Sequence, residues 1–173
     1  MSADREDIGD PYRRLSERGL QLPAAPSARG LYQPAVLDAD RLVLGAHGPV
    51  ALDGSGGFSH TGRVGWEIDL ETAVEAARIV AVNMLATAHS ALGDLRRVER
   101  VLEVTGYVNA TREFMDHAVV VDGASRLLVD VFGRAGEHAR TAVGVASLPF
   151  AVPVVISMTA RVRLTTFGLT GTS

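Results

Sequence analysis

An arginine near the C-terminal end of the chain is the residue best suited to chemistry. Arg140 directly precedes a predicted apolar strand, Thr141–Ser147. The planar guanidinium group donates two parallel, charge-assisted hydrogen bonds, a geometry that matches a carboxylate. An arginine held by rigid sheet backbone is therefore a candidate anion anchor. The alternative is a surface arginine that caps a strand and binds no ligand.

The composition of the 173-residue chain excludes several kinds of catalysis. It has no cysteine, which excludes thiol catalysis, disulfides and thiolate metal sites. It has no lysine, because all 17 basic residues are arginine, and this excludes Schiff-base chemistry on a side chain and covalent attachment of pyridoxal phosphate. The histidines are too scattered along the sequence to predict a metal site. We expect neither a metal nor a cofactor.

Charge and hydropathy bear on partners and location. The net charge is −3 and aromatic residues make up only 5% of the chain, so we expect no nucleic-acid partner. No apolar run approaches the roughly 20 residues that span a bilayer. Residues 1–14 lack the apolar segment of a signal peptide. We therefore expect a cytoplasmic protein that does not associate with a membrane.

Hydrophobic periodicity and capping residues predict an α+β domain. A short helix is expected at Pro11–Arg18, and a long one from the cap Asp69 to Leu92, with Gly93 after its end. The long helix is apolar on one face and rich in alanine on the other, which indicates that it lies between a sheet and a neighbouring helix. The predicted strands are Leu31–Leu37, Arg41–Ala46, Val98–Val108, Thr141–Ser147 and Val154–Leu164.

The stretch between the third and fourth strands is harder to interpret. It has helical periodicity but contains the β-branched run 119–121 and then Gly123. We therefore predict two pieces, one at Arg112–His117 and one that begins after Asp122 as N-cap and ends at Gly133. The element order β-β-α-β-α-β-β places the helices on one face of the sheet. The expected organisation is an N-terminal extension at 1–20, one domain at 21–164 and a tail at 165–173.

Several short motifs occur along the chain in a characteristic order and spacing. They are Gly19-Leu20-Gln21-Leu22-Pro23, Gly45-Ala46-His47-Gly48-Pro49, Gly62-Arg63-Val64-Gly65, Gly123-Ala124-Ser125-Arg126-Leu127-Leu128, His138-Ala139-Arg140 and Leu148-Pro149. Over roughly residues 19–160 this pattern resembles the longer members of the RidA family, also called YjgF or L-PSP. The resemblance implies a chorismate-mutase-like fold with a mixed sheet and two helices on one face. It also implies a homotrimer with three sites in the clefts between subunits.

The resemblance further implies the activity and the residues of the site. Members hydrolyse an imine or enamine to a ketone and ammonia, and the arginine that matches Arg140 binds the substrate's carboxylate. His47 lies in the segment where the family usually reads Ser-Gly-Gln, so it could be a general base, or a histidine hydrogen-bonded within its loop. The candidate catalytic residues are Arg140 and His47, and the other candidate substrate-binding residues are Tyr32, Ala46, Thr141, Ala142, Val155 and Ser125.

One departure from the family pattern concerns the water-positioning glutamate, whose place Val155 takes. In the last predicted strand, Val155 is also the only hydrophobic residue on the face that otherwise carries Ser157, Thr159 and arginines. We expect an enzyme whose reaction has diverged toward a tautomerisation, cyclisation or hydrolysis in a biosynthetic pathway. The alternative is a non-catalytic homotrimer that binds small carboxylates. An RNA-cleaving activity gains no support from these residues.

Overall fold

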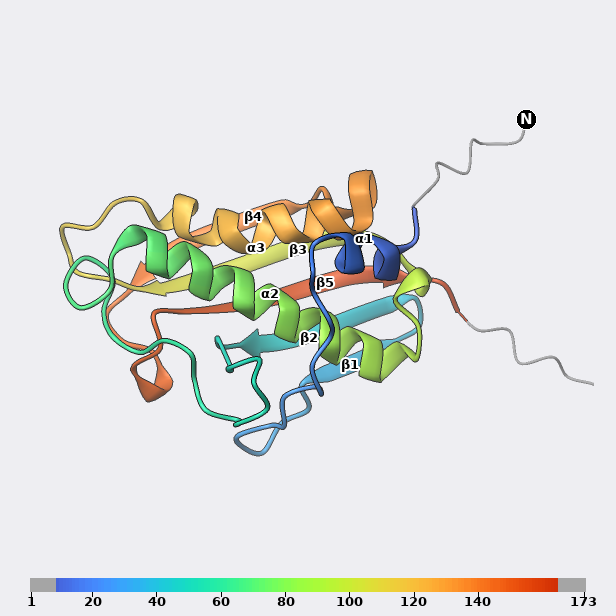
Figure 1. Ribbon diagram of the computed structural model, residues 1–173, viewed down its shortest axis with the longest axis horizontal. Coiled ribbons are helices and arrows are strands. Elements are labelled where there is room, and N and C mark those ends of the chain that lie inside the picture. The colour runs from blue at the N-terminus through green and yellow to red at the C-terminus, as the bar shows by residue number, and fades with distance from the viewer. Residues whose placement is uncertain (1–8, 165–173) are drawn as a thin grey trace, which may run out of the picture.

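A five-stranded mixed sheet runs through the protein, with the spatial order β1-β2-β5-β3-β4 (Figure 1). The computed structural model describes residues 9–164. All neighbouring strands are antiparallel except β3 and β4, which are parallel. The strands are β1 (Ala35–Asp38), β2 (Arg41–His47), β3 (Val98–Asn109), β4 (Ala139–Val145) and β5 (Val154–Val162).

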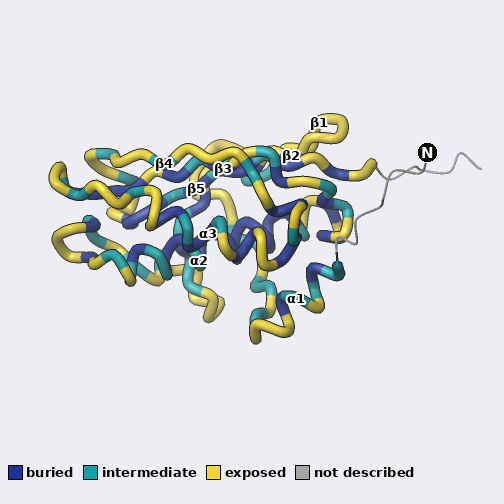
Figure 2. Tube along the Cα trace, turned by 90° about the horizontal axis from the view of Figure 1, so that it is seen from above, coloured by how far each residue is buried: buried dark blue, intermediate teal, exposed yellow. Residues whose placement is uncertain are grey.

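Two long helices, α2 (Leu70–Leu92) and α3 (His117–Phe132), cover one face of this sheet (Figure 2). A short helix, α1 (Pro11–Glu17), packs on the side of the helix layer that faces away from the sheet. Three single turns of 3-10 helix lie at Leu95–Arg97, Gly133–Gly136 and Pro149–Ala151. The predicted α+β architecture, with helices on one face of a mixed sheet, is confirmed. None of the helices in residues 9–164 is both long and apolar enough to cross a bilayer.

Helix α2 has the ends that its sequence predicts. The Asp69 side chain accepts a hydrogen bond of 2.7 Å from the backbone N–H of Thr72, and Gly93 adopts the left-handed conformation with φ = 76°. Its middle is buried on every side, because the sheet covers one face and α3 packs on another. The alanine-rich second face therefore meets a helix, as expected.

Helix α3 corrects the prediction of two pieces. It is continuous from His117 to Phe132, and residues 112–116 form a turn instead of the predicted helix at Arg112–His117. Asp122 is an interior residue of α3 rather than an N-cap, and its carboxylate pairs with Arg140. Val120 and Val121 are fully buried, so packing outweighs the weak helix propensity of β-branched residues.

Gly123 does not break α3 because it serves close packing between helices. A Cβ atom at this position would lie 2.1 Å from the carbonyl oxygen of Val74 in α2. The glycine thus lets the two helices approach more closely than any other residue would allow. The contact also sets the rotation of α3 about its axis.

Strand boundaries differ from the predictions at the sheet edges. β1 begins at Ala35 rather than Leu31, immediately after Pro34. β4 extends from Ala139 to Val145 and not to Ser147, because its parallel pairing with β3 begins at Glu103–Ala139 and ends at Asn109–Val145. Arg140 is therefore the second residue of the strand. β5 ends at Val162, two residues before the predicted end.

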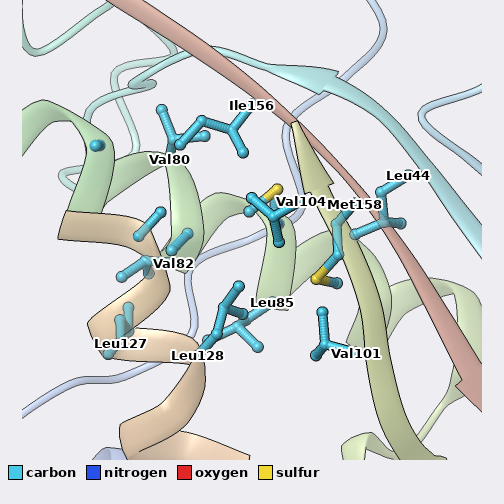
Figure 3. Packing of buried hydrophobic residues seen from close by; sticks show 14 of the residues in the cluster. Leu44, Val80, Val82, Leu85, Val101, Val104, Leu127, Leu128, Ile156 and Met158 are labelled. Carbon is cyan, nitrogen blue, oxygen red and sulfur yellow. The ribbon is translucent and has the colours of Figure 1, made fainter. Parts of the chain in front are cut away.

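The core lies between the helix layer and the sheet (Figure 3). Alternate residues of β5 are buried there, as its sequence predicts: Val154, Ile156, Met158, Ala160 and Val162. The opposite face of the sheet has no covering layer within residues 9–164 (Figure 2). It exposes apolar side chains that include Val36, Val43, Tyr107 and Val143.

We predict that Gly123→Ala destabilises the protein by about 2 kcal/mol or more, because the added methyl group must push α2 and α3 apart. The direction of the change is informative, because glycine to alanine in a solvent-exposed helix raises the free energy of unfolding by up to roughly 1 kcal/mol. Urea-induced unfolding measures the effect. Gly57→Ala, in an exposed loop where the nearest atom is 3.6 Å from the new Cβ, is the control. Equal stability of the two variants would contradict this account of the helix contact.

Candidate functional site

The structure separates the predicted site residues into two groups. Four of them line a pocket of about 410 Å³: Tyr32, Ala46, His47 and Val155. The other four lie on the edge strand β4 and on helix α3: Arg140, Thr141, Ala142 and Ser125.

The pocket forms where β2 and β5 meet the loops at the end of the sheet. Its walls come from β2, β5, the segment 26–34, the loop 48–58 and the turn 149–152. Val155 is half-buried on the helix-free face of the sheet, opposite Tyr107 of β3. Apolar side chains dominate the lining, and no carboxylate takes part in it. Val155, for which the family resemblance implied a glutamate, contributes a hydrocarbon side chain to this lining.

His47 lies at the end of β2, where the pairing with β5 shifts register. Its side chain is only 7% exposed. Nδ1 lies 2.7 Å from the carbonyl oxygen of Gly45, and Nε2 lies 2.9 Å from the hydroxyl oxygen of Thr87 in α2. A carbonyl only accepts hydrogen bonds, so Nδ1 carries the proton and Nε2 accepts from the hydroxyl. Burial lowers the pKa of His47 and keeps it neutral.

These contacts correspond to the second alternative for His47, an imidazole that is hydrogen-bonded within the fold. The lone pair that a general base would use is already occupied by Thr87. His47 can receive a proton from a ligand only after that hydrogen bond breaks. Its catalytic role stays a prediction, and its structural role is to join the end of β2 to α2.

Arg140 belongs to a chain of polar side chains between β4 and α3. Its Nη1 donates to Oδ1 of Asp122 at 2.5 Å and to Oγ of Ser125 at 3.2 Å. Ser125 in turn contacts Nε2 of His138 at 3.0 Å, and Nδ1 of His138 contacts the carbonyl oxygen of Gly136 at 2.5 Å. Burial lowers the pKa of His138, and the neighbouring Arg140 charge acts in the same direction.

The neutral form of His138 gives these hydrogen bonds a direction. Nδ1 donates to the carbonyl of Gly136, so Nε2 accepts from the Ser125 hydroxyl. The Ser125 oxygen is then free to accept from Arg140. Asp122 was not among the predicted site residues. Its spacing of three from Ser125 puts both on one face of a helix, a signal that the misplaced N-cap concealed.

The guanidinium of Arg140 keeps one edge unused. Within residues 9–164, Nε and Nη2 donate no hydrogen bond, and the side chain is 25% exposed. This edge has the two parallel donors that a carboxylate binds. Asp122 and Ser125 hold the other nitrogen, so the side chain is oriented before any ligand arrives.

Arg140 and the pocket residue Val155 lie on opposite faces of the sheet. Arg140 is on the face that α3 covers, as its contacts with Asp122 and Ser125 require. Val155 points to the other face. There it lies in a row with Tyr107 of β3 and Val143 of β4. A single copy of the chain therefore does not bring Arg140 to the pocket.

Most lining residues of the pocket were not predicted from the sequence, and three of them bear on its chemistry. Arg29, Phe58 and Phe150 come from three loops, where no periodicity marks a residue as buried or exposed. Among residues 9–164, Arg29 is the only arginine in the lining. Within residues 9–164 no group of three or more histidine, aspartate or glutamate side chains could hold a metal ion.

Comparison with known proteins places the whole domain in one family. Residues 12–162 match the family model described as "YjgF/chorismate mutase-like, putative endoribonuclease". The chain is similar to protein TCP17 of Trypanosoma cruzi, with 36% identity over 143 residues, which cover 82% of this chain and 88% of that protein.

Solved structures agree with this assignment. Protein Atu1372 of Agrobacterium tumefaciens is 37% identical, with a TM-score of 0.81 over 89% of this chain and 92% of that one. A protein of Shewanella oneidensis, described as a putative endoribonuclease, is 27% identical, with a TM-score of 0.84 over 89% of this chain and 100% of that one.

Two histidines, the buried His47 and the half-buried His138, predict a dependence of stability on pH. The pKa values of His47 and His138 are lower in the folded chain than in the unfolded one, so the unfolded chain binds protons more readily. The free energy of unfolding should be constant above the unfolded pKa of about 6.5 and fall as the pH decreases below it. Urea titrations between about pH 8 and pH 5 measure this slope. A His47→Asn, His138→Asn double variant should show a smaller slope, and an unchanged slope would refute the assignment.

Proposed function

Since the chain belongs to the YjgF/chorismate mutase-like family, also called RidA, we propose that it binds a small carboxylate-bearing imine, enamine or related carbonyl compound and acts on it. The site lies between two copies of the chain. One copy supplies the apolar pocket with Tyr32 and Val155, and the other supplies Arg140.

The observation that carries this proposal is the state of Arg140. Its Nη1 is held by Asp122 and Ser125, while Nε and Nη2 donate to nothing within residues 9–164. A pre-oriented guanidinium loses less conformational entropy when it binds a carboxylate than a free one does. An arginine that served only to cap its strand would need no such support from a neighbouring helix.

The exposed face of the sheet supports assembly. Apolar residues of all five strands lie on it, including Val36 at 50% exposure and Val143 at 40%. The row formed by Val143, Tyr107 and Val155 leads from β4 towards the pocket. A second copy packed on this face would cover the apolar side chains and add its own β4 edge to the site. We propose a homotrimer, in keeping with the family resemblance.

The pocket chemistry favours a reaction that needs orientation more than proton transfer. Hydrolysis of an imine adds water to the C=N carbon, and the resulting carbinolamine releases ammonia to leave a ketone. The attacking water must lose a proton, and neither Val155 nor the hydrogen-bonded His47 is arranged to accept it. Anion binding at Arg140 and exclusion of water by the apolar walls suit a tautomerisation or cyclisation instead.

The hydrocarbon side chain of Val155 and the hydrogen-bonded imidazole of His47 also favour one alternative, a non-catalytic module that binds small carboxylates. A pocket with a hydrocarbon at position 155 and an occupied imidazole at position 47 can hold a ligand without transforming it. The anion anchor would be unchanged. The two functions therefore share a binding site and differ only in turnover.

We predict that Arg140→Ala weakens the binding of 2-oxobutanoate by about tenfold or more, which isothermal titration calorimetry measures. Arg140→Lys should restore part of the affinity, because the charge remains while the planar fork is lost. Arg13→Ala, which removes only an exposed arginine of α1, is the control. Ammonia release from freshly generated 2-iminopropanoate tells the enzyme from the binding module. If Arg140→Ala binds 2-oxobutanoate with unchanged affinity, the proposed role of Arg140 as anion anchor is wrong.

We also predict that Val155→Glu creates or increases the release of ammonia from 2-iminopropanoate. The new carboxylate would stand on the pocket wall and could accept a proton from the attacking water. Val155→Gln, which has the same shape but cannot act as a base at neutral pH, should remain inactive. A well-folded but inactive Val155→Glu variant would show that the segment 45–47 limits the reaction instead.

A further inference from the structure

Arg29 brings a positive charge into the wall of an otherwise apolar pocket. It shares this lining with aliphatic and aromatic groups that include Val50, Phe58 and Val152. His47 is neutral because burial lowers its pKa, so Arg29 is the charged residue of the lining. Arg29 is exposed, so water screens part of its charge and an anion can reach it from solvent.

Two phenyl rings hold the Arg29 side chain in place. Its Cζ lies 4.5 Å from the ring centre of Phe58 and 5.4 Å from that of Phe150. The two rings are themselves in contact, with centres 5.3 Å apart. Stacking of a guanidinium on aromatic faces fixes its plane and leaves the N–H groups on its edge free. Nη2 also donates to the carbonyl oxygen of Gly56, which ties the segment 26–34 to the loop 48–58.

The backbone beside the Phe150 ring has an unusual conformation. Phe150 has φ = 59° and Ala151 has φ = 54°, in the left-handed region that bulky residues rarely adopt. Such conformations cost free energy and occur mainly where a ligand or a functional contact requires them. The turn directs Phe150 towards Arg29 and into the pocket lining. On the other side, the Phe58 ring lies over Gly48, where a Cβ atom would be 3.1 Å from Cε1.

No acidic group neutralises Arg29 within residues 9–164. Its contacts there are the two rings and the Gly56 carbonyl. Asp53 lies in the adjacent loop, but its carboxylate accepts from the backbone N–H of Ser55 at 2.9 Å. Four of the five guanidinium N–H donors are thus available to a ligand.

From this arrangement we propose that Arg29 is a second anion-binding residue of the pocket and that the ligand class is a dicarboxylate. One carboxylate binds Arg140 of a second copy, and the other binds Arg29. The carbon chain between them lies against the apolar walls. This inference rests on the proposed function for the role of Arg140, but Arg29 itself is placed in the pocket by its own contacts.

Matched pairs of keto acids test the proposal by calorimetry on the full-length protein. The diacids 2-oxoglutarate and 2-oxoadipate are compared with 2-oxopentanoate and 2-oxohexanoate, which have the same chain lengths and lack the second carboxylate. At least one diacid should bind on the order of tenfold more tightly than its monoacid partner, as expected for one charge-assisted hydrogen-bonded pair.

Variants of Arg29 assign that preference to one side chain. Arg29→Gln keeps much of the stacking and removes the charge, so it should weaken binding of the diacid more than binding of the monoacid and abolish the preference between them. Arg29→Lys should retain part of the preference. Arg13→Gln removes an exposed arginine of α1 and controls for the change in net charge. Thermal unfolding of each variant checks that the fold is intact.

The outcomes separate this inference from the proposed function. Equal affinities for diacids and monoacids, or a preference that persists in Arg29→Gln, would overturn the role of Arg29 and leave Arg140 as the anchor. If Arg140→Ala leaves the affinities unchanged while Arg29→Gln weakens the binding of both diacid and monoacid, Arg140 is not an anchor. The proposed binding of one ligand by both arginines is then wrong as well. Absence of binding by every keto acid would overturn both proposals.

Discussion

The close packing of α2 against α3, side by side on one face of the sheet, is the constraint on which the rest of the structure depends. At the contact of the helices, the backbone of α2 occupies the space where a side chain at position 123 would be. This contact sets the rotation of α3 and therefore the face that it presents to β4. Asp122 and Ser125 lie on that face and hold Arg140. The orientation of the candidate anchor is thus a consequence of how two helices pack.

The same layer arrangement explains why the candidate site is divided. The helices bury one face of the sheet, and the side chains of β4 and β5 alternate between the two faces. Arg140 belongs to the covered face, and Val155 belongs to the open one. No change of side-chain conformation in one chain brings them together, because the sheet lies between them. A site that uses both needs a second copy, and the exposed apolar row on the open face offers a surface for it.

The pocket itself combines hydrocarbon walls with a single stacked guanidinium. Such a lining favours a ligand with an apolar body and an acidic end, and it disfavours proton transfer, which needs a free base. The hydrocarbon side chain of Val155 and the hydrogen-bonded imidazole of His47 point in the same direction. Binding and orientation are what these residues can supply, and the proposed reaction is restricted to steps that need little more.

Local signals in the sequence determined the α+β class, both ends of α2 and the buried face of β5, since caps and alternation depend on neighbouring residues alone. They also indicated Arg140. The tertiary structure alone decided that α3 is continuous, because burial of its valines outweighs their helix propensity. It also decided that Asp122 faces Arg140 and that Arg29 packs on the rings of Phe58 and Phe150. Those partners lie far apart in the chain, and only the packed fold places them in contact.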